Sequence, residues 1–87
     1  MKTMTVTVSL SGLNAHEIAM SVQTASRFRS EIHLTDGERR MNAKSIMGMM
    51  ALGLALGDEV TIEANGPDEE EAAYAMASYL QGENEAG

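Results

Sequence analysis

Four short segments of the chain alternate apolar and polar residues, and this period of two limits the fold more than any other feature. Successive side chains of a strand point to opposite faces, so the alternation predicts strands with one buried face and one wetted face. The expected strands span residues 4–10, 31–35, 39–43 and 59–64. The apolar positions expected to face the core are Met4, Val6, Val8, Leu10, Ile32, Leu34, Met41, Ala43, Val60, Ile62 and Ala64.

Two helices are expected between these strands, because apolar residues there recur at helical spacing. Asn14, with Glu17 three residues later, resembles a capping box in which Asn replaces the usual Ser or Thr, and it predicts the start of the first helix. Ser45 is expected to cap the second helix and Gly53 to end it. The expected bounds are 15–27 and 46–52.

A third helix is expected after the last strand. Pro67 tolerates the first helical turn, and the acidic residues that follow it complement the positive end of the helix dipole. Residues 82–87 are expected to form a frayed tail. The buried stripe of this helix should contain Ala72, Ala73, Met76, Tyr79 and Leu80.

The element order is therefore βαββαβα within a single domain of residues 1–87. Asp36-Gly37 predicts a hairpin of type I′ between the second and third strands, because Gly tolerates positive φ. Each strand has one apolar and one polar face, so the sheet should be antiparallel with helices on one face only. The fold class expected is α+β, an open-faced sandwich. The polar face should expose Thr5, Thr7, Thr61 and Glu63 to water.

Composition narrows the function by exclusion. The absence of Cys excludes disulfides and thiolate chemistry, and the net charge of −7 argues against nucleic acid and anionic membranes as partners. His16 and His33 have no carboxylates at ligand spacing, so neither a metal site nor a cofactor is expected. The longest apolar run, residues 46–56, is too short to span a bilayer, and the alternating N-terminal segment is unlike a signal peptide. We expect a cytoplasmic protein that is recognised by partners and is not an enzyme.

Three stretches carry a family resemblance: Gly12-Leu13 before the first helix, residues 42–50 (NAKSIMGMM) and residues 66–69 (GPDE). Together they resemble the HPr family, the histidine-containing phosphocarriers of the bacterial sugar phosphotransferase system. The resemblance covers residues 3–81 and implies the element order derived above. The middle stretch is most similar to that of the Crh-type HPr-like regulators, which lack the phosphocarrier histidine.

The resemblance also implies a phosphocarrier site that this sequence has lost. In the family a histidine follows Gly-Leu, an arginine comes two residues later and a proline comes next; the corresponding residues here are Asn14, His16 and Glu17. Asn cannot carry a phosphoramidate, and Glu17 adds negative charge where the phosphate would lie. As an alternative, His16 could serve as the acceptor, although two residues around a helix rotate a side chain by about 200°. Otherwise His16 is a surface or partner-contacting residue.

Ser45 is the second position to which the resemblance assigns a role. It implies regulatory phosphorylation of Ser45, whereas the local pattern requires only a helix cap; the two roles are compatible. A phosphate on an N-cap serine faces unpaired N–H groups and a favourable dipole. Arg39, Arg40 and Lys44 stand nearby in the sequence and could screen the added charge.

Apolar residues crowd the helix that Ser45 caps. If Ile46 or Met49 turns inward, Met47 and Met50 are left facing solvent. Either the loop 54–56 covers them, or they form a partner-binding patch. The resemblance implies that Ile46, Met47, Met50 and His16 contact partners, namely HPr kinase/phosphorylase and either catabolite control protein A or another regulatory protein. A third hypothesis is a scaffold protein that is not phosphorylated and that uses only the Met-rich surface.

Overall fold

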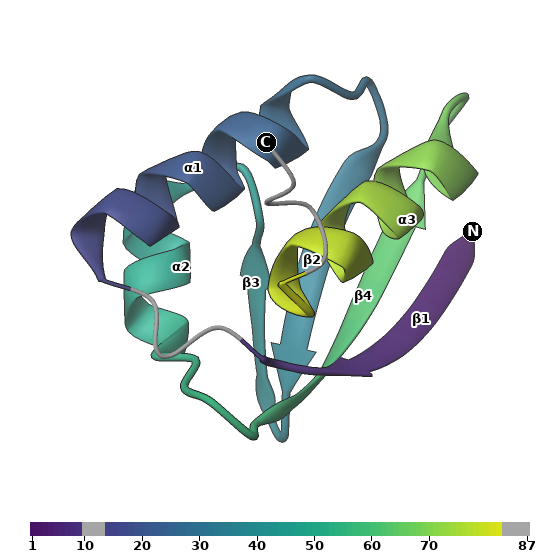
Figure 1. Cartoon of the computed structure of the whole chain (residues 1–87). Helices are drawn as coiled ribbons and strands as arrows, with labels where there is room; N and C mark the ends of the chain where they lie inside the picture. Colours follow the sequence, from purple (N-terminus) through teal and green to yellow (C-terminus); the bar gives the residue numbers. More distant parts are fainter. Residues whose placement is uncertain (10–13, 83–87) are drawn as a thin grey trace.

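The computed structural model describes residues 1–9 and 14–82, and its elements follow the order expected from the sequence. The helix expected over 46–52 has those bounds, and the one expected over 15–27 is one residue shorter. In chain order the elements are β1 (Lys2–Thr7), α1 (Ala15–Ser26), β2 (Glu31–Asp36), β3 (Arg39–Asn42), α2 (Ile46–Leu52), β4 (Glu59–Asn65) and α3 (Glu69–Leu80) (Figure 1).

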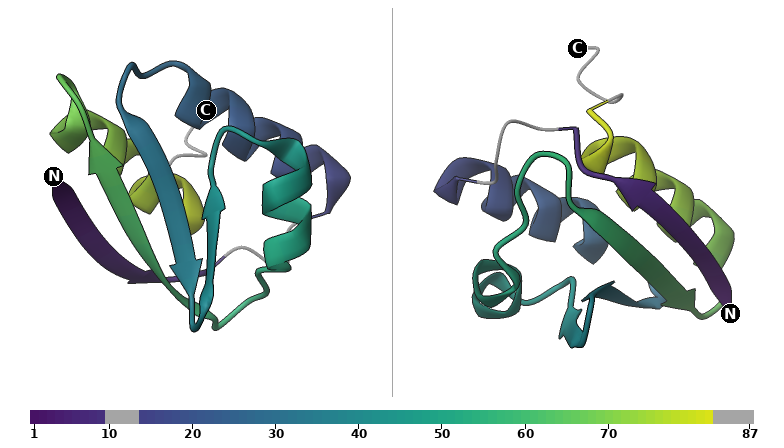
Figure 2. Two further views of the ribbon diagram at one scale, coloured as in Figure 1. Left: turned by 180° about the vertical axis from the view of Figure 1, so that it is seen from behind. Right: turned by 90° about the horizontal axis from the view of Figure 1, so that it is seen from below.

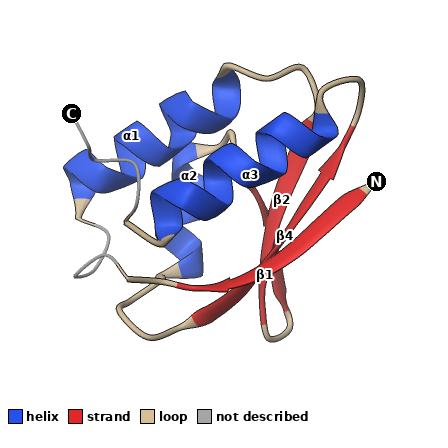
Figure 3. Cartoon of the chain, turned by 45° about the vertical axis from the view of Figure 1, so that its right-hand side comes forward, coloured by secondary structure: helices blue, strands red, loops and turns tan. Residues whose placement is uncertain are grey.

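The four strands form one antiparallel sheet in the order β1-β4-β2-β3. In the central strand β4, Ile62 lies opposite Met4 of β1 and Leu34 of β2. Figure 3 shows α1 and α3 side by side over one face of this sheet. The views in Figure 2 place α2 next to the edge strand β3 and beneath the N-terminal half of α1. The expected α+β open-faced sandwich is confirmed.

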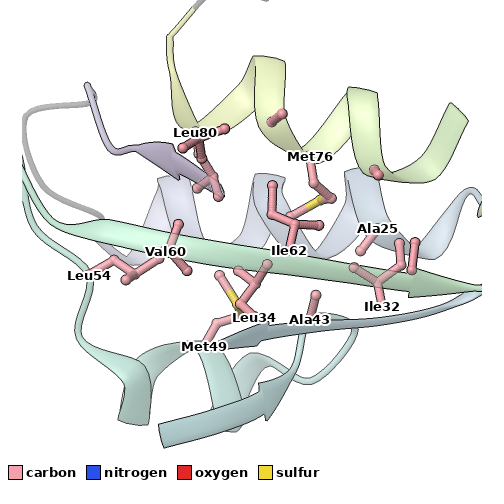
Figure 4. Close-up of a cluster of buried hydrophobic side chains, with 14 of the residues drawn as sticks. Ala25, Ile32, Leu34, Ala43, Met49, Leu54, Val60, Ile62, Met76 and Leu80 are labelled. Carbon is pink, nitrogen blue, oxygen red and sulfur yellow. The ribbon is translucent and has the colours of Figure 1, made fainter. Parts of the chain in front are cut away.

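The core fills the space between the sheet and the helices (Figure 4). The alternating apolar positions of the two inner strands are buried, as predicted, whereas Met4 and Met41 are only partly buried because they lie in the edge strands β1 and β3. On the opposite face Thr5 and Thr7 are exposed, and the hydroxyls of Thr5 and Thr61 are 3.1 Å apart. Residues buried in the core include Val6, Val8, Ile18, Ala25, Ile32, Leu34, Met49, Leu52, Val60, Ile62, Met76 and Leu80.

The first strand differs from its expected bounds. It was expected over residues 4–10, but β1 spans Lys2–Thr7. Beyond Thr7, Val8 still bonds the segment before β4, because its N–H donates to the carbonyl of Asp58 and its carbonyl accepts from the N–H of Gly57, both at 2.8 Å. The next residue turns to α3, where the N–H of Ser9 donates to the carbonyl of Leu80 at 2.9 Å. Leu10, the Gly12-Leu13 motif and residues 83–87 of the expected tail lie outside the residues that the structure describes.

The turn between β2 and β3 was expected to be of type I′, and this prediction is wrong. Asp36 pairs with Arg39, so the two central residues are Gly37 and Glu38. Gly37 has φ of 65°, and positive φ occurs only at glycines among the described residues. Type I′ needs positive φ at both central positions, whereas type II′ needs it only at the first, where Gly is favoured. The turn therefore fits type II′.

The start of α3 also differs, because the helix begins at Glu69 and Pro67 lies before it. Asp68 is the N-cap residue, but its carboxylate turns away to accept hydrogen bonds from the N–H of Arg29 and from the N–H and hydroxyl of Ser30, at 2.6–2.9 Å. The Ser30 hydroxyl, followed by the Arg29 N–H, holds the pKa of Asp68 below its ordinary value. Gly66 lies so close to Ser30 that a Cβ atom on Gly66 would be 2.6 Å from the Ser30 Cα atom.

Candidate functional site

Ser45 caps α2, as predicted. Its backbone is extended, and its Oγ accepts a hydrogen bond of 3.1 Å from the N–H of Gly48. The helix ends at Gly53, which has φ of 65° and whose N–H reaches the carbonyl of Met49. The hydroxyl of Ser45 thus lies at the positive end of the helix dipole, beside backbone N–H groups.

The turn before Ser45 is built by Asn42, a role that the sequence reasoning missed. The Asn42 side-chain oxygen accepts from the N–H of Lys44 at 2.8 Å, and its carbonyl accepts from the N–H of Ser45 at 3.0 Å. The Lys44 ammonium then donates to the carbonyl of Phe28, just beyond α1, at 2.8 Å. An Asn that bonds the backbone two residues later is typical of a turn, and this signal was available in the sequence. These bonds fix the approach of the chain to Ser45.

Gly48 is a second residue whose importance was not predicted. A Cβ atom at this position would lie 3.3 Å from the carbonyl oxygen of Asn42 and 3.4 Å from Ser45 Oγ. The lack of a side chain therefore keeps space open beside the serine hydroxyl. A glycine inside a short helical segment costs stability and is a signal of close packing or function.

The exposed surface of α2 is strongly apolar. Ile46, Met47 and Met50 are 50%, 81% and 59% exposed, whereas Met49 and Leu52 point into the core. Figure 4 shows Met49 among the buried side chains. Leu54 is buried, but the loop 54–56 leaves Met47 and Met50 uncovered. We call Ile46, Met47 and Met50 the α2 face.

The cations expected to screen Ser45 have other partners. Arg39 donates to the carbonyl of Ala51 at 2.8 Å, at the C-terminal end of α2 and hence away from Ser45. Arg40 forms an ion pair with Glu63 across the open face of the sheet, with 3.0 Å between Nε and Oε1. Lys44 is bonded to Phe28. Of the three residues expected to help screen a charge on Ser45, Arg40 is thus paired with a carboxylate, Arg39 is held at the far end of α2, and Lys44, next to Ser45, donates one hydrogen bond to a neutral carbonyl.

Asn14 is the N-cap residue of α1, and His16 lies in the first turn of this helix. The Asn14 side chain accepts from the N–H of Glu17 at 2.9 Å, so the predicted cap is confirmed. His16 is exposed at the second helical position. The Tyr79 hydroxyl donates to the carbonyl of Glu17 at 3.0 Å and ties this turn to α3; burial and the nearby Glu17 charge raise the pKa of Tyr79. Because α1 packs against α2, this turn and the α2 face belong to neighbouring helices (Figure 2).

His33 is partly exposed in β2, between Glu63 of β4 and Asn42 of β3. Across residues 1–9 and 14–82, no three His, Asp or Glu side chains are grouped so as to hold a metal ion. Within the same residues, every helix is too short or too polar to cross a membrane.

Comparison with known proteins identifies relatives over most of the chain. The family model of the phosphotransferase-system HPr component phosphorylation site matches residues 2–82. HPr-like protein Crh of Bacillus subtilis is 47% identical over 72 residues, which are 83% of this chain and 85% of Crh. The crystal structure of the phosphocarrier protein HPr from Bacillus anthracis is 43% identical with a TM-score of 0.89, covering 92% of this chain and 96% of HPr. A crystal structure of Bacillus subtilis Crh, described as a domain-swapped dimer, is 46% identical over 84% of each chain with a TM-score of 0.78.

Proposed function

The chain belongs to the HPr family, and on this premise we propose that it is a regulatory docking protein of carbon catabolite control, switched by phosphorylation of Ser45. The observation that carries the proposal is the position of Ser45 at the start of α2, directly before the exposed Ile46 and Met47. A modifiable hydroxyl and an exposed apolar surface thus share one short helix. Exposed apolar surface of this kind marks interaction sites.

The local structure of Ser45 is compatible with a phosphate. Its Oγ already lies beside the N–H groups of the first turn of α2, which favour negative charge. A phosphate adds about −1.5 to −2 charges to a protein whose net charge is −7. Because Arg40 is paired with Glu63, and Arg39 and Lys44 are held at backbone carbonyls, we expect the partner protein to supply Arg or Lys aimed at the phosphate, together with a hollow for Met47 and Met50.

HPr kinase/phosphorylase is the partner proposed to modify Ser45. Catabolite control protein A, or another regulatory protein, is the partner proposed to bind the modified form. Support comes from the likeness to Crh, which is described as a catabolite repression protein of Bacillus subtilis. His16 lies on the neighbouring helix α1 and is proposed to contact the same partner.

The test is calorimetric titration of catabolite control protein A with the protein before and after treatment with HPr kinase and ATP. Phosphorylation should tighten binding at least about tenfold, because one hydrogen bond to a charged group contributes about 1.5–3 kcal/mol. Ser45→Ala should abolish this difference. Met47→Asp should accept phosphate but bind about tenfold more weakly, since it removes apolar contact and adds a like charge.

Tyr74→Asp is the matched control, because Tyr74 is also an exposed apolar residue but lies on α3. It should bind like the wild type. Equal affinity of the two phosphorylation states would overturn the proposed switch, and equal effects of Met47→Asp and Tyr74→Asp would overturn the assignment of the α2 face.

A second candidate function is a phosphocarrier of the phosphoenolpyruvate-dependent sugar phosphotransferase system that uses His16. The observation in its favour is that His16 is exposed in the first turn of α1, where a phosphoryl donor can reach it. The cap formed by Asn14 weighs against it, because the N–H of Glu17 is already bonded to the Asn14 side chain.

A further inference from the structure

The eight methionines of the chain occupy very different environments. Met49 and Met76 have no exposed surface, and Met4 and Met41 are partly buried. Met47 and Met50 are exposed on α2, whereas the other exposed methionines are Met20 on α1 and Met1, which precedes β1. One helix therefore presents two accessible thioethers on its outer side while it buries a third in the core.

We propose that Met47 and Met50 form an oxidation site, at which conversion to methionine sulfoxide weakens docking through the α2 face; this rests on the proposed docking function. The oxidant is a hydroperoxide. Its O–O bond breaks as the thioether sulfur attacks one oxygen, an S–O bond forms, and the sulfur loses two electrons. Hydrogen peroxide is thereby reduced to water, and the sulfoxide can be returned to the thioether by a two-electron reductant such as a sulfoxide reductase.

The positions of the side chains make this modification local. Met47 and Met50 point away from the core, so a sulfoxide on either can be solvated without moving Met49 or Leu52. The change replaces a flexible apolar side chain with a polar one on the surface that the partner must desolvate. Ser45 keeps its cap bond to Gly48, so the phosphorylation site is untouched. The two modifications act on the same helix and have opposite effects on docking. Phosphorylation strengthens it by supplying charge, and oxidation weakens it by removing apolar contact.

The first experiment maps oxidation. The folded protein is treated with hydrogen peroxide for increasing times, excess peroxide is removed, and sulfoxide is measured at each methionine by peptide mass spectrometry. Met47 and Met50 should oxidise at least about tenfold faster than Met49 and Met76, because oxidation follows access of the oxidant to sulfur. The far-ultraviolet circular dichroism and the urea midpoint should be unchanged at this stage. Equal rates at all four residues would overturn the proposal.

The second experiment measures docking with a non-oxidisable variant. Met47→Leu/Met50→Leu preserves side-chain volume and helix propensity, and it retains Met1 and Met20 as oxidisable internal controls. Both proteins are first phosphorylated on Ser45, then oxidised, freed of peroxide and titrated into catabolite control protein A. Oxidation should lower the affinity of the wild type by about tenfold or more and leave the double variant unchanged.

The outcomes separate this proposal from the docking function. If the reduced phosphoprotein binds and oxidation weakens both proteins equally, the oxidation site is not on the α2 face and the proposal fails while docking stands. The proposal also fails if oxidation leaves wild-type affinity unchanged. If the reduced phosphoprotein does not bind, the docking function fails and the proposed weakening falls with it, whatever the peptide map shows of Met47 and Met50.

Discussion

At the scale of single residues, one oxygen atom carries two roles. Ser45 Oγ accepts the N–H of Gly48 and is also the atom proposed to receive phosphate. Asn42 fixes the approach of the backbone, and Gly48 keeps the space beside the hydroxyl open. The structural and regulatory roles of this site can be separated by substitutions that keep one and remove the other.

Ser45→Ala should lower the free energy of unfolding by about 1 kcal/mol, because the cap bond to Gly48 is lost. Ser45→Asp should retain most of the wild-type stability, since Asp is an equally good N-cap and its charge complements the dipole. Neither variant can be phosphorylated at this position. Urea midpoints of the three proteins measure the effect, and equal midpoints for Ser45→Ala and the wild type would show that the cap contributes nothing.

Gly48→Ala should slow phosphorylation of Ser45 by HPr kinase while changing stability little. The added methyl group would gain about 0.5–1 kcal/mol of helix propensity, which is offset by crowding at 3.3 Å against the Asn42 carbonyl. The same methyl would lie 3.4 Å from Ser45 Oγ, where the kinase must act. The control is Gly53→Ala, which should destabilise the protein because φ is 65° there, yet leave the initial rate of phosphorylation unchanged. Equal rates for Gly48→Ala and the wild type would contradict the role given to Gly48.

At the scale of elements, β4 supplies the centre of the sheet and α3 is joined to the segment after α1 by one carboxylate. The sequence predicted β4 well, because its alternation is a local pattern. It did not predict the link from Asp68 to Ser30, because these residues are 38 positions apart and only the folded chain brings them together. Each of these features yields a stability measurement with an internal control.

Ile62→Ala should cost about 2–5 kcal/mol of stability, because Ile62 is fully buried in the central strand. Thr61→Ala should cost much less, since the neighbouring Thr61 faces the open side and loses only a hydroxyl contact with Thr5. Denaturant midpoints provide the comparison. Shifts of equal size would mean that the two faces of β4 are assigned the wrong way round.

Asp68 should make folding sensitive to acid. Its pKa in the folded protein is lowered, chiefly by the Ser30 hydroxyl and the Arg29 N–H, relative to an unfolded value of about 3.9. Its contribution is therefore present in full above that value and is lost as the pH falls through the lowered native pKa. Asp68→Asn should be less stable than the wild type at pH 7 and lose less stability on acidification below about pH 5. If Asp68→Asn and the wild type lose stability equally on acidification, the Asp68 contacts do not contribute to the pH dependence of folding.

At the scale of the whole molecule, the sequence predicted what depends on neighbours along the chain and missed what depends on neighbours in space. The caps at Asn14 and Ser45 follow from local motifs and are confirmed. Arg39 and Arg40 are adjacent in sequence, but strand alternation sends them to opposite faces of β3, one to α2 and the other to Glu63. Proximity to Ser45 along the chain therefore did not predict proximity in the fold.

Whether the protein accepts phosphate from phosphoenolpyruvate distinguishes the two candidate functions of the molecule as a whole. We expect enzyme I and phosphoenolpyruvate to leave the protein unmodified, because Asn14 cannot form a phosphoramidate and Glu17 places a negative charge in the same helical turn. His16 is exposed, but it lies inside the helix that Asn14 caps, two residues beyond the position of Asn14.

Intact-mass spectrometry at neutral pH measures the transfer, with Bacillus anthracis HPr as the positive control. Asn14→His should restore little transfer, since no arginine stands two residues later to neutralise the phosphoimidazole. His16→Gln should leave phosphorylation by HPr kinase unchanged. Rapid, stoichiometric and acid-labile phosphate on the wild type that disappears in His16→Gln would establish the phosphocarrier function instead. Phosphate that appears only with HPr kinase and ATP, and is lost in Ser45→Ala, would leave the Ser45 switch as the chemistry through which this protein acts.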